Sequence, residues 1–150
     1  MHRYGASMVG LNRPLLWGGT LSLLAAFLHI AIIIGGPAWY RFFGAGEQFA
    51  RLAEQGSPLP DTMTAIIALI LLLWSLYAFA GAGLVHRLPW LRSILMLITA
   101  VYLIRGMALL PLALFMPQAV DSFLILSSLI CMVIGMLHFS GTRQMIWELS

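Results

Sequence analysis

The chain has 150 residues, of which 61% are hydrophobic and only 9% are charged, whereas soluble domains carry about 25% charged residues. This composition excludes a water-soluble globular core, and the net charge of +3 comes from dispersed arginines, which gives no basis for nucleic-acid binding. Four apolar runs are each about as long as the ~20 residues needed to cross a hydrocarbon layer. The sequence therefore predicts an all-α integral membrane protein with a single membrane domain, residues 1–150, folded as an antiparallel bundle of four transmembrane helices.

The first predicted span covers residues 15–36 and leads into an outer loop at residues 37–61. Aromatic and charged residues alternate in this loop, which predicts a short amphipathic segment lying along the membrane interface. Trp39 and Tyr40 stand where amphipathic rings often mark that interface. Glu47 follows after residues 44–46, a glycine-rich stretch that we expect to break the segment into two pieces. The segment could then form a lid over the bundle.

The other predicted spans cover residues 62–85, 90–115 and 119–140, and short turns join them. Short turns imply antiparallel neighbours, as in an up-and-down bundle. Pro111 is expected to kink the outer end of the third span. Small and polar residues recur at spacings of three and four along every span, as in helices that associate closely within a membrane. We expect these stripes to face the bundle axis.

The placement of the arginines predicts the orientation, because short cytoplasmic loops are enriched in positive charge. Five arginines fall on one side of the predicted spans and two on the other; the first group is Arg3, Arg13, Arg87, Arg92 and Arg143, and the second is Arg41 and Arg51. This split places both termini in the cytoplasm. The absence of lysine beside abundant alanine, glycine and arginine is compatible with a bacterial gene, so we expect a bacterial inner-membrane protein.

Arg105 stands in the middle of the third predicted span, where a charge costs roughly 2.5 to 3.5 kcal/mol on translocon scales. An arginine stays protonated, so it must meet an acid, backbone carbonyls, water or a bound anion. A rise of about 1.5 Å per residue places Arg105 and His29 at similar depths, on the outer side of their span centres. Ser128 falls at a similar depth, and Tyr102 lies one turn below Arg105. We therefore expect an outward-opening polar pocket around these four residues.

The acidic candidates for this pocket lie closer to the outer surface than Arg105 does. Asp121 heads the fourth span and Glu47 belongs to the outer loop. Contact with either would require the arginine to reach outward and the loop to dip inward. Trp39 and Tyr40, in the same loop as Glu47, complete the expected roof and are candidate ligand-binding residues.

These residues also have structural interpretations. Arg105 could bond to carbonyls freed near Pro111 and simply hold the bundle together. His29 could be a hydrogen-bonded core residue, and Tyr102 and Ser128 could join helices by hydrogen bonds. What favours a ligand site is the common depth of these four polar residues.

Motifs that carry chemistry are absent from the sequence. It has no glycine-rich phosphate loop, metal-binding His-Glu spacing or nucleophile elbow. His29 is the only central group suited to acid-base catalysis, so it is the one catalytic candidate. A haem held by His86 and His138 is conceivable in a helix bundle, but both lie at the predicted membrane boundary, where polar residues are common. We therefore predict no cofactor and no metal.

The sequence leaves three functional hypotheses. The favoured one is binding of an amphiphilic, anionic ligand, such as a lipid, a quinone or a fatty-acyl group, with its head group on Arg105. The second is a structural or accessory subunit whose helices and Arg105 dock a larger membrane partner or another copy of the chain. The third is a small transporter or channel assembled by oligomerisation. Membrane lipids are expected partners in every case.

Overall fold

The computed structural model describes residues 10–44 and 46–148, and the part of the chain that it describes contains helices and no strands. This confirms the all-helical prediction. The elements in chain order are α1 (Arg13–Phe42), α2 (Glu47–Glu54), α3 (Leu59–Ala82), α4 (Leu91–Met107), α5 (Leu109–Phe115), the 3₁₀ helix η1 (Pro117–Ala119) and α6 (Ser122–Glu148).

Four helical segments are long enough and apolar enough to cross a membrane, which indicates an integral membrane protein. They are Arg13–Phe42, Leu59–Ala82, Leu91–Phe115 and Ser122–Trp147, and the third of them combines α4 and α5. Large apolar side chains are exposed along all four. Such exposure is unfavourable in water but suits contact with lipid chains.

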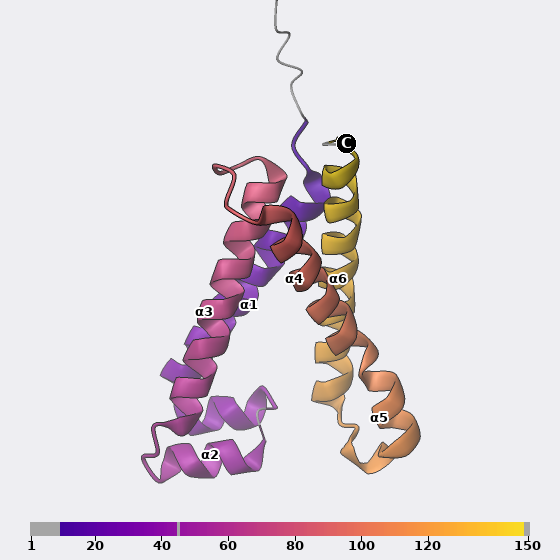
Figure 1. Cartoon of the computed structure of the whole chain (residues 1–150). Helices are drawn as coiled ribbons and strands as arrows, with labels where there is room; N and C mark the ends of the chain where they lie inside the picture. Colours follow the sequence, from indigo (N-terminus) through magenta and orange to yellow (C-terminus); the bar gives the residue numbers. More distant parts are fainter. Residues whose placement is uncertain (1–9, 45, 149–150) are drawn as a thin grey trace, which may run out of the picture.

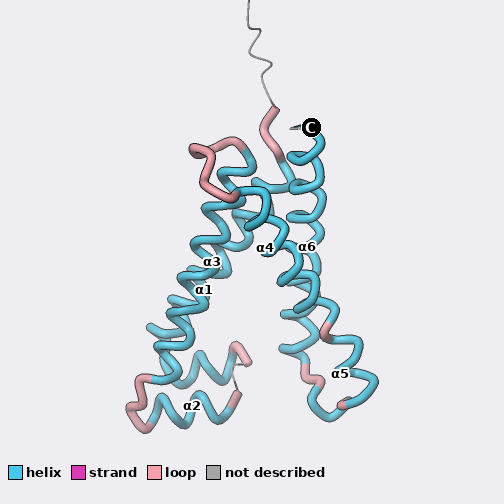
Figure 2. Tube along the Cα trace, viewed as in Figure 1, coloured by secondary structure: helices cyan, strands magenta, loops and turns pink. Residues whose placement is uncertain are grey.

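The long helices form two pairs that meet at one end and diverge toward the other (Figure 1). We call α1 with α3 the first arm and α4 with α6 the second arm. The first described residues and the end of α6 lie at the joined end, whereas α2 and α5 lie at the far ends of the two arms (Figures 1 and 2). Contacts of α1 with α6 and of α3 with α4 hold the arms together. The divergence separates the outer halves of helices that share a core at the joined end.

The small-residue stripes that the sequence predicts are buried along α3 and α4. On α3 the buried residues at this spacing are Thr64, Ala68, Leu71, Ser75, Ala78 and Ala82. On α4 they are Leu95, Thr99, Tyr102 and Gly106. Fully buried leucines from α1 and α4, Leu15 and Leu95, belong to the same hydrophobic cluster. Small side chains on these faces let the backbones approach closely.

Asn12 fastens the beginning of α1 to α6. Its side-chain nitrogen donates to the carbonyl of Gly141 at 2.8 Å, and its side-chain oxygen accepts from the backbone N–H of Leu15 at 3.1 Å. The residue is 3% exposed. The amide therefore caps one helix and ties it to another with a single buried group.

We expect Asn12→Ala to lower the free energy of unfolding by about 1 to 3 kcal/mol, because it leaves the Leu15 N–H without its acceptor and removes the buried bond to the Gly141 carbonyl. Asn12→Ser should have a smaller effect, since serine can still cap α1 but is too short to reach Gly141. Thermal unfolding of the detergent-solubilised protein would measure both. Equal stability of the wild type and the two variants would show that the hydrogen bonds of the Asn12 side chain contribute nothing to stability.

α1 changes direction at Gly36 and Pro37. Gly36 has φ +66° and ψ −150°, a backbone conformation that favours glycine. The chain beyond it stays helical to Phe42 and lies across the end of the first arm beside α2 (Figure 1). The outer loop expected at residues 37–61 is therefore mostly helical. The predicted break at residues 44–46 falls between α1 and α2, and residue 45 lies outside the described residues.

The third span breaks after Met107. α4 ends there, and α5 begins at Leu109. Pro111 has no backbone N–H, and its ring crowds the carbonyl of the residue four positions earlier, which is Met107. The predicted kink is confirmed, and it lies directly beyond Arg105.

Candidate functional site

Arg105 lies across the interface between α4 and α6, near the middle of the apolar segment Leu91–Phe115. Its Nη1 donates to the Ser128 hydroxyl at 2.9 Å, and its Nη2 donates to the Ser127 hydroxyl at 3.0 Å. Ser127 in turn donates to the carbonyl of Leu124. The two neighbouring serines therefore hold the guanidinium in one orientation against α6.

The close approach of α4 and α6 makes this geometry available. A Cβ atom added to Gly106 would come within 2.9 Å of the Met132 backbone nitrogen. On the opposite side, a Cβ atom on Gly135 would lie 2.8 Å from the Leu103 side chain. The glycines thus allow the two backbones to come close enough for Arg105 to reach the hydroxyls of α6.

No carboxylate among the described side chains lies within ion-pair distance of Arg105. Glu47 and Glu54 are bound to Arg41, and Asp61 accepts a hydrogen bond from Tyr40. Serine hydroxyls orient a cation but carry no charge to neutralise it. The guanidinium also has five N–H groups, and its bonds to the described residues use two of them. Arg105 is therefore a fixed positive charge with donors to spare.

Asp121 has a local role at the beginning of α6. Its carboxylate accepts from the backbone N–H of Leu124 at 2.6 Å, as an acidic residue does when it caps a helix. The side chain is exposed. Asp121 therefore serves the beginning of α6, and its carboxylate forms no ion pair with Arg105.

Tyr102 faces a different neighbourhood from Arg105. Its hydroxyl bonds to Ser22 of α1 at 2.8 Å, and since Ser22 donates to the carbonyl of Gly18, Tyr102 is the donor in this pair. Its ring packs edge-on against Trp74 and lies 5.4 Å from the ring of His138, centroid to centroid. Tyr102 therefore joins the two arms at the core.

His29 lies on the first arm, beside a cavity of about 320 Å³ between α1, α2 and α3. Its Nδ1 is 2.7 Å from the carbonyl of Ala25. The expected grouping of four residues is thus divided in space: Arg105 with Ser128 on the second arm, His29 on the first arm, and Tyr102 in the shared core.

Trp39 and Tyr40 lie in the helical turn beyond the Gly36 kink. Tyr40 is fully buried, and its hydroxyl donates to Asp61 at 2.7 Å, which ties the end of α1 to the beginning of α3. Trp39 is 41% exposed and folds back over Gly35. Of the two, Tyr40 lines the cavity beside His29.

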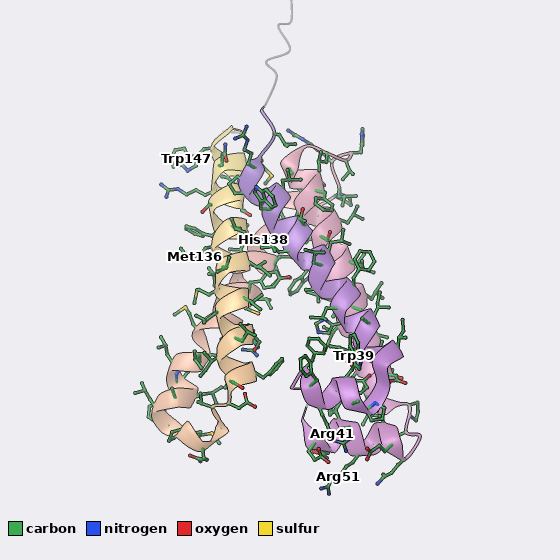
Figure 3. The ribbon with its side chains drawn as sticks, turned by 180° about the vertical axis from the view of Figure 1, so that it is seen from behind. Trp39, Arg41, Arg51, Met136, His138 and Trp147 are labelled. Carbon is green, nitrogen blue, oxygen red and sulfur yellow. The ribbon has the colours of Figure 1, made fainter. Side chains whose placement is uncertain are left out.

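α2 covers the outer end of the first arm and is held there by ion pairs. Arg41 bonds to Glu47 at 2.8 Å and to Glu54 at 2.7 Å, and Arg51 bonds to Glu47 at 3.1 Å. Figure 3 shows Arg41 and Arg51 at this end of the molecule. The buried Ala50 packs with Ile32 and Tyr40 beneath the ion pairs. Glu47 therefore secures the predicted lid and is bound to arginines other than Arg105.

The attachment of α2 should weaken in acid. Hydrogen bonds from Arg41 and Arg51 lower the pKa of Glu47 from 4.5 to about 2, and the bond from Arg41 also lowers the pKa of Glu54. A carboxylate whose pKa is depressed by folding contributes stability above its unfolded pKa and loses it as the pH falls toward its folded pKa. The ion pairs should therefore hold α2 at neutral pH and release it between about pH 4.5 and pH 2.

A spin label at Gln48→Cys, in a Cys131→Ser background, would report this release. We expect low label mobility at neutral pH and rising mobility as the pH falls through that range. Arg41→Ala should give high mobility already at neutral pH. Mobility that stays low in acid would mean that apolar packing of Ala50 alone holds α2.

The two histidines considered for a haem lie in different environments, one buried and one exposed. His138 is fully buried, faces Gly18 and bonds through Nδ1 to the carbonyl of Ile134 at 3.0 Å (Figure 3). His86 is exposed in the loop between α3 and α4. In the described part of the chain, no cluster of three or more His, Cys, Asp or Glu residues could hold a metal ion.

Ser127 and Phe123 are among the residues of these sites that sequence reasoning missed. Ser127 has the same relation to Arg105 as Ser128 does, and a pair of adjacent serines opposite an intramembrane arginine could have been recognised as a joint acceptor. Phe123 lines the cavity beside His29 although it belongs to α6. No sequence signal connects it to α1, because that contact depends on how the arms meet. The chain matches no family model, and no curated protein or solved structure is found to be similar to it.

Proposed function

We propose that the protein binds an anionic amphiphile within the membrane, with Arg105 as the partner of the anionic head group. The observation that carries this proposal is a guanidinium oriented by Ser127 and Ser128 and neutralised by no described carboxylate. A carboxylate or phosphate group matches the planar fork of a guanidinium and forms bonds about twice as strong as neutral ones. Such a ligand would supply the missing negative charge.

The surroundings of Arg105 suit the apolar part of such a ligand. Ile104 is 69% exposed and Leu110 is 63% exposed, on either side of the break between α4 and α5. An acyl or isoprenoid chain could lie along these side chains while its head group reaches the arginine. This arrangement would compensate the cost of a charge at this depth.

We further propose that the four spans are antiparallel in a bacterial inner membrane, with both termini in the cytoplasm. Arg13, Arg87, Arg92 and Arg143 are exposed on elements at the joined end. At the opposite end, Arg41 and Arg51 are paired with glutamates. The unpaired positive charges thus gather at the end that the positive-inside rule assigns to the cytoplasm. Fluorescence of a C-terminal fusion to green fluorescent protein would test this, since a periplasmic terminus would leave the fusion dark.

Mass spectrometry of the lipids that co-purify with the protein would test the ligand proposal. We expect the wild type to retain one class of anionic amphiphile and Arg105→Leu to lose it. Arg92→Leu is the matched control, because Arg92 lies on the same helix but is exposed near its beginning. It should retain the amphiphile at the wild-type level.

Other outcomes would support the other functional classes. Retention of the same amphiphile by Arg105→Leu would reject the proposal. Loss of a co-purifying protein, with no change in lipid, would mean that Arg105 docks a membrane partner. A change from oligomer to monomer would point to self-association, as an accessory subunit or an oligomeric transporter requires.

A further inference from the structure

A second, chemically different environment lies on the first arm. The cavity of about 320 Å³ has walls from α1, α2 and α3, and Phe123 is the one described lining residue that belongs to the second arm. The side chain of Phe123 lies against Gly44 and so reaches across the divergence between the two arms. The cavity is within the size range of small-molecule sites, and since a water molecule takes up about 30 Å³ of liquid, it accommodates about ten heavy atoms.

His29 lines this cavity, and one of its ring nitrogens has no hydrogen-bond partner among the described residues. Its Nδ1 lies 2.7 Å from the carbonyl oxygen of Ala25, and a carbonyl can only accept, so Nδ1 must carry the proton. In the neutral imidazole the other nitrogen, Nε2, is then an acceptor. No described residue donates to Nε2. An acceptor beside an apolar cavity calls for a donor from a ligand or from water.

The lining of the cavity selects against charged ligands. No arginine, aspartate or glutamate lines it, and most of its wall is apolar, including Ile32, Phe49 and Ile67. The hydroxyl of Tyr40 is already donated to Asp61. An anion would meet no cation and a cation would meet no carboxylate, so burial of either would be costly.

We propose that this cavity binds an uncharged amphiphile with a single hydroxyl group, of the long-chain alcohol type. The hydroxyl donates to Nε2 of His29, and about ten carbon atoms fill the space beneath α2. This site is separate from Arg105, which does not line the cavity. The two sites differ in the head group that they bind: the cavity beside His29 takes a neutral hydrogen-bond donor, and Arg105 takes an anion.

Photolabelling of the intact protein in nanodiscs tests the proposal. The probe is a long-chain alcohol with a diazirine in the middle of its chain, and the matched probe is the corresponding fatty acid. We expect the alcohol to label peptides from the cavity wall around Phe49 and Met63. Dodecanol should compete with it, whereas dodecane, which has no hydroxyl, should compete several-fold less well.

Three variants separate this site from the rest of the molecule. His29→Phe keeps a ring but removes the acceptor, and should reduce labelling about fivefold, as expected for the loss of one hydrogen bond. Ile32→Phe adds volume to a residue that lines the cavity, and should abolish labelling even if His29→Phe disturbs folding. His86→Phe, at an exposed loop position, should label like the wild type.

The effect of Arg105→Leu on alcohol labelling shows whether the protein has one ligand site or two. Arg105→Leu should leave alcohol labelling unchanged, whatever it does to anionic lipids. Equal labelling of the wild type and both cavity variants would overturn the proposal. So would labelling of the same wall peptides by the fatty acid as strongly as by the alcohol, because the cavity would then not discriminate between a neutral and a charged head group.

Discussion

Arg105→Leu is expected to abolish binding of an anionic amphiphile while leaving the free energy of unfolding unchanged or raising it by up to about 3 kcal/mol, the order of the cost of a charge within a span. The variant removes a charge that no described carboxylate neutralises and replaces it with a side chain suited to the membrane interior. What it loses are the two bonds to Ser127 and Ser128. A structural role for Arg105 predicts the opposite sign, because the helix pair would then lose its main polar link.

Thermal unfolding after delipidation, measured for Arg105→Leu and the wild type, separates the two interpretations. Delipidation matters because a bound ligand would itself stabilise the wild type by mass action. Arg105→Lys is the matched variant: it keeps the charge but loses the planar fork, so it should bind the amphiphile more weakly than the wild type. A delipidated Arg105→Leu protein that unfolds several degrees lower would show that the arginine serves the fold.

Gly106→Val is expected to separate α4 from α6 and to lower the free energy of unfolding by about 3 kcal/mol or more. A Cβ atom at this position would lie 2.9 Å from the Met132 nitrogen and 3.0 Å from its Cα atom. These are backbone atoms of a helix, so the two helices must move apart as a unit. Overpacking in a well-packed core typically costs about 1 to 3 kcal/mol, and a β-branched side chain extends beyond the first clash.

The same change should also disrupt the Arg105 site. If α4 and α6 move apart, the guanidinium loses the two serines that orient it, and binding of the amphiphile should fall with stability. Leu97→Val is the control, because Leu97 also lies on α4, is 60% exposed and stands about two helical turns before Arg105. It should alter neither property. Wild-type stability of Gly106→Val would mean that the close contact between the two helices is not required.

The membrane architecture follows from the sequence because it depends on local composition. Run length and hydropathy indicate the spans, and the spacing of small residues indicates the buried faces of α3 and α4. The break near Pro111 follows from the missing N–H of proline. Each of these signals lies within one helix, and a single chain segment is enough to detect it.

The composition of the site does not follow in the same way, because it depends on how separate helices meet. Equal depth suggested that Arg105, His29 and Tyr102 share one pocket, but depth says nothing about which arm a helix joins. The divergence of the arms leaves His29 beside its own cavity and directs Tyr102 to Ser22 in the core. Depth also fails for Glu47, because it forms ion pairs with Arg41 and Arg51 and not with Arg105.

The central claim is that the positive charge of Arg105 is neutralised by a bound anionic head group. An experimental map of the protein in native nanodiscs tests this most directly. We expect elongated density whose head group lies about 3 Å from the Arg105 guanidinium, on the side away from Ser127 and Ser128. A guanidinium bonded only to those serines and to water, or paired with a carboxylate of another chain, would contradict it.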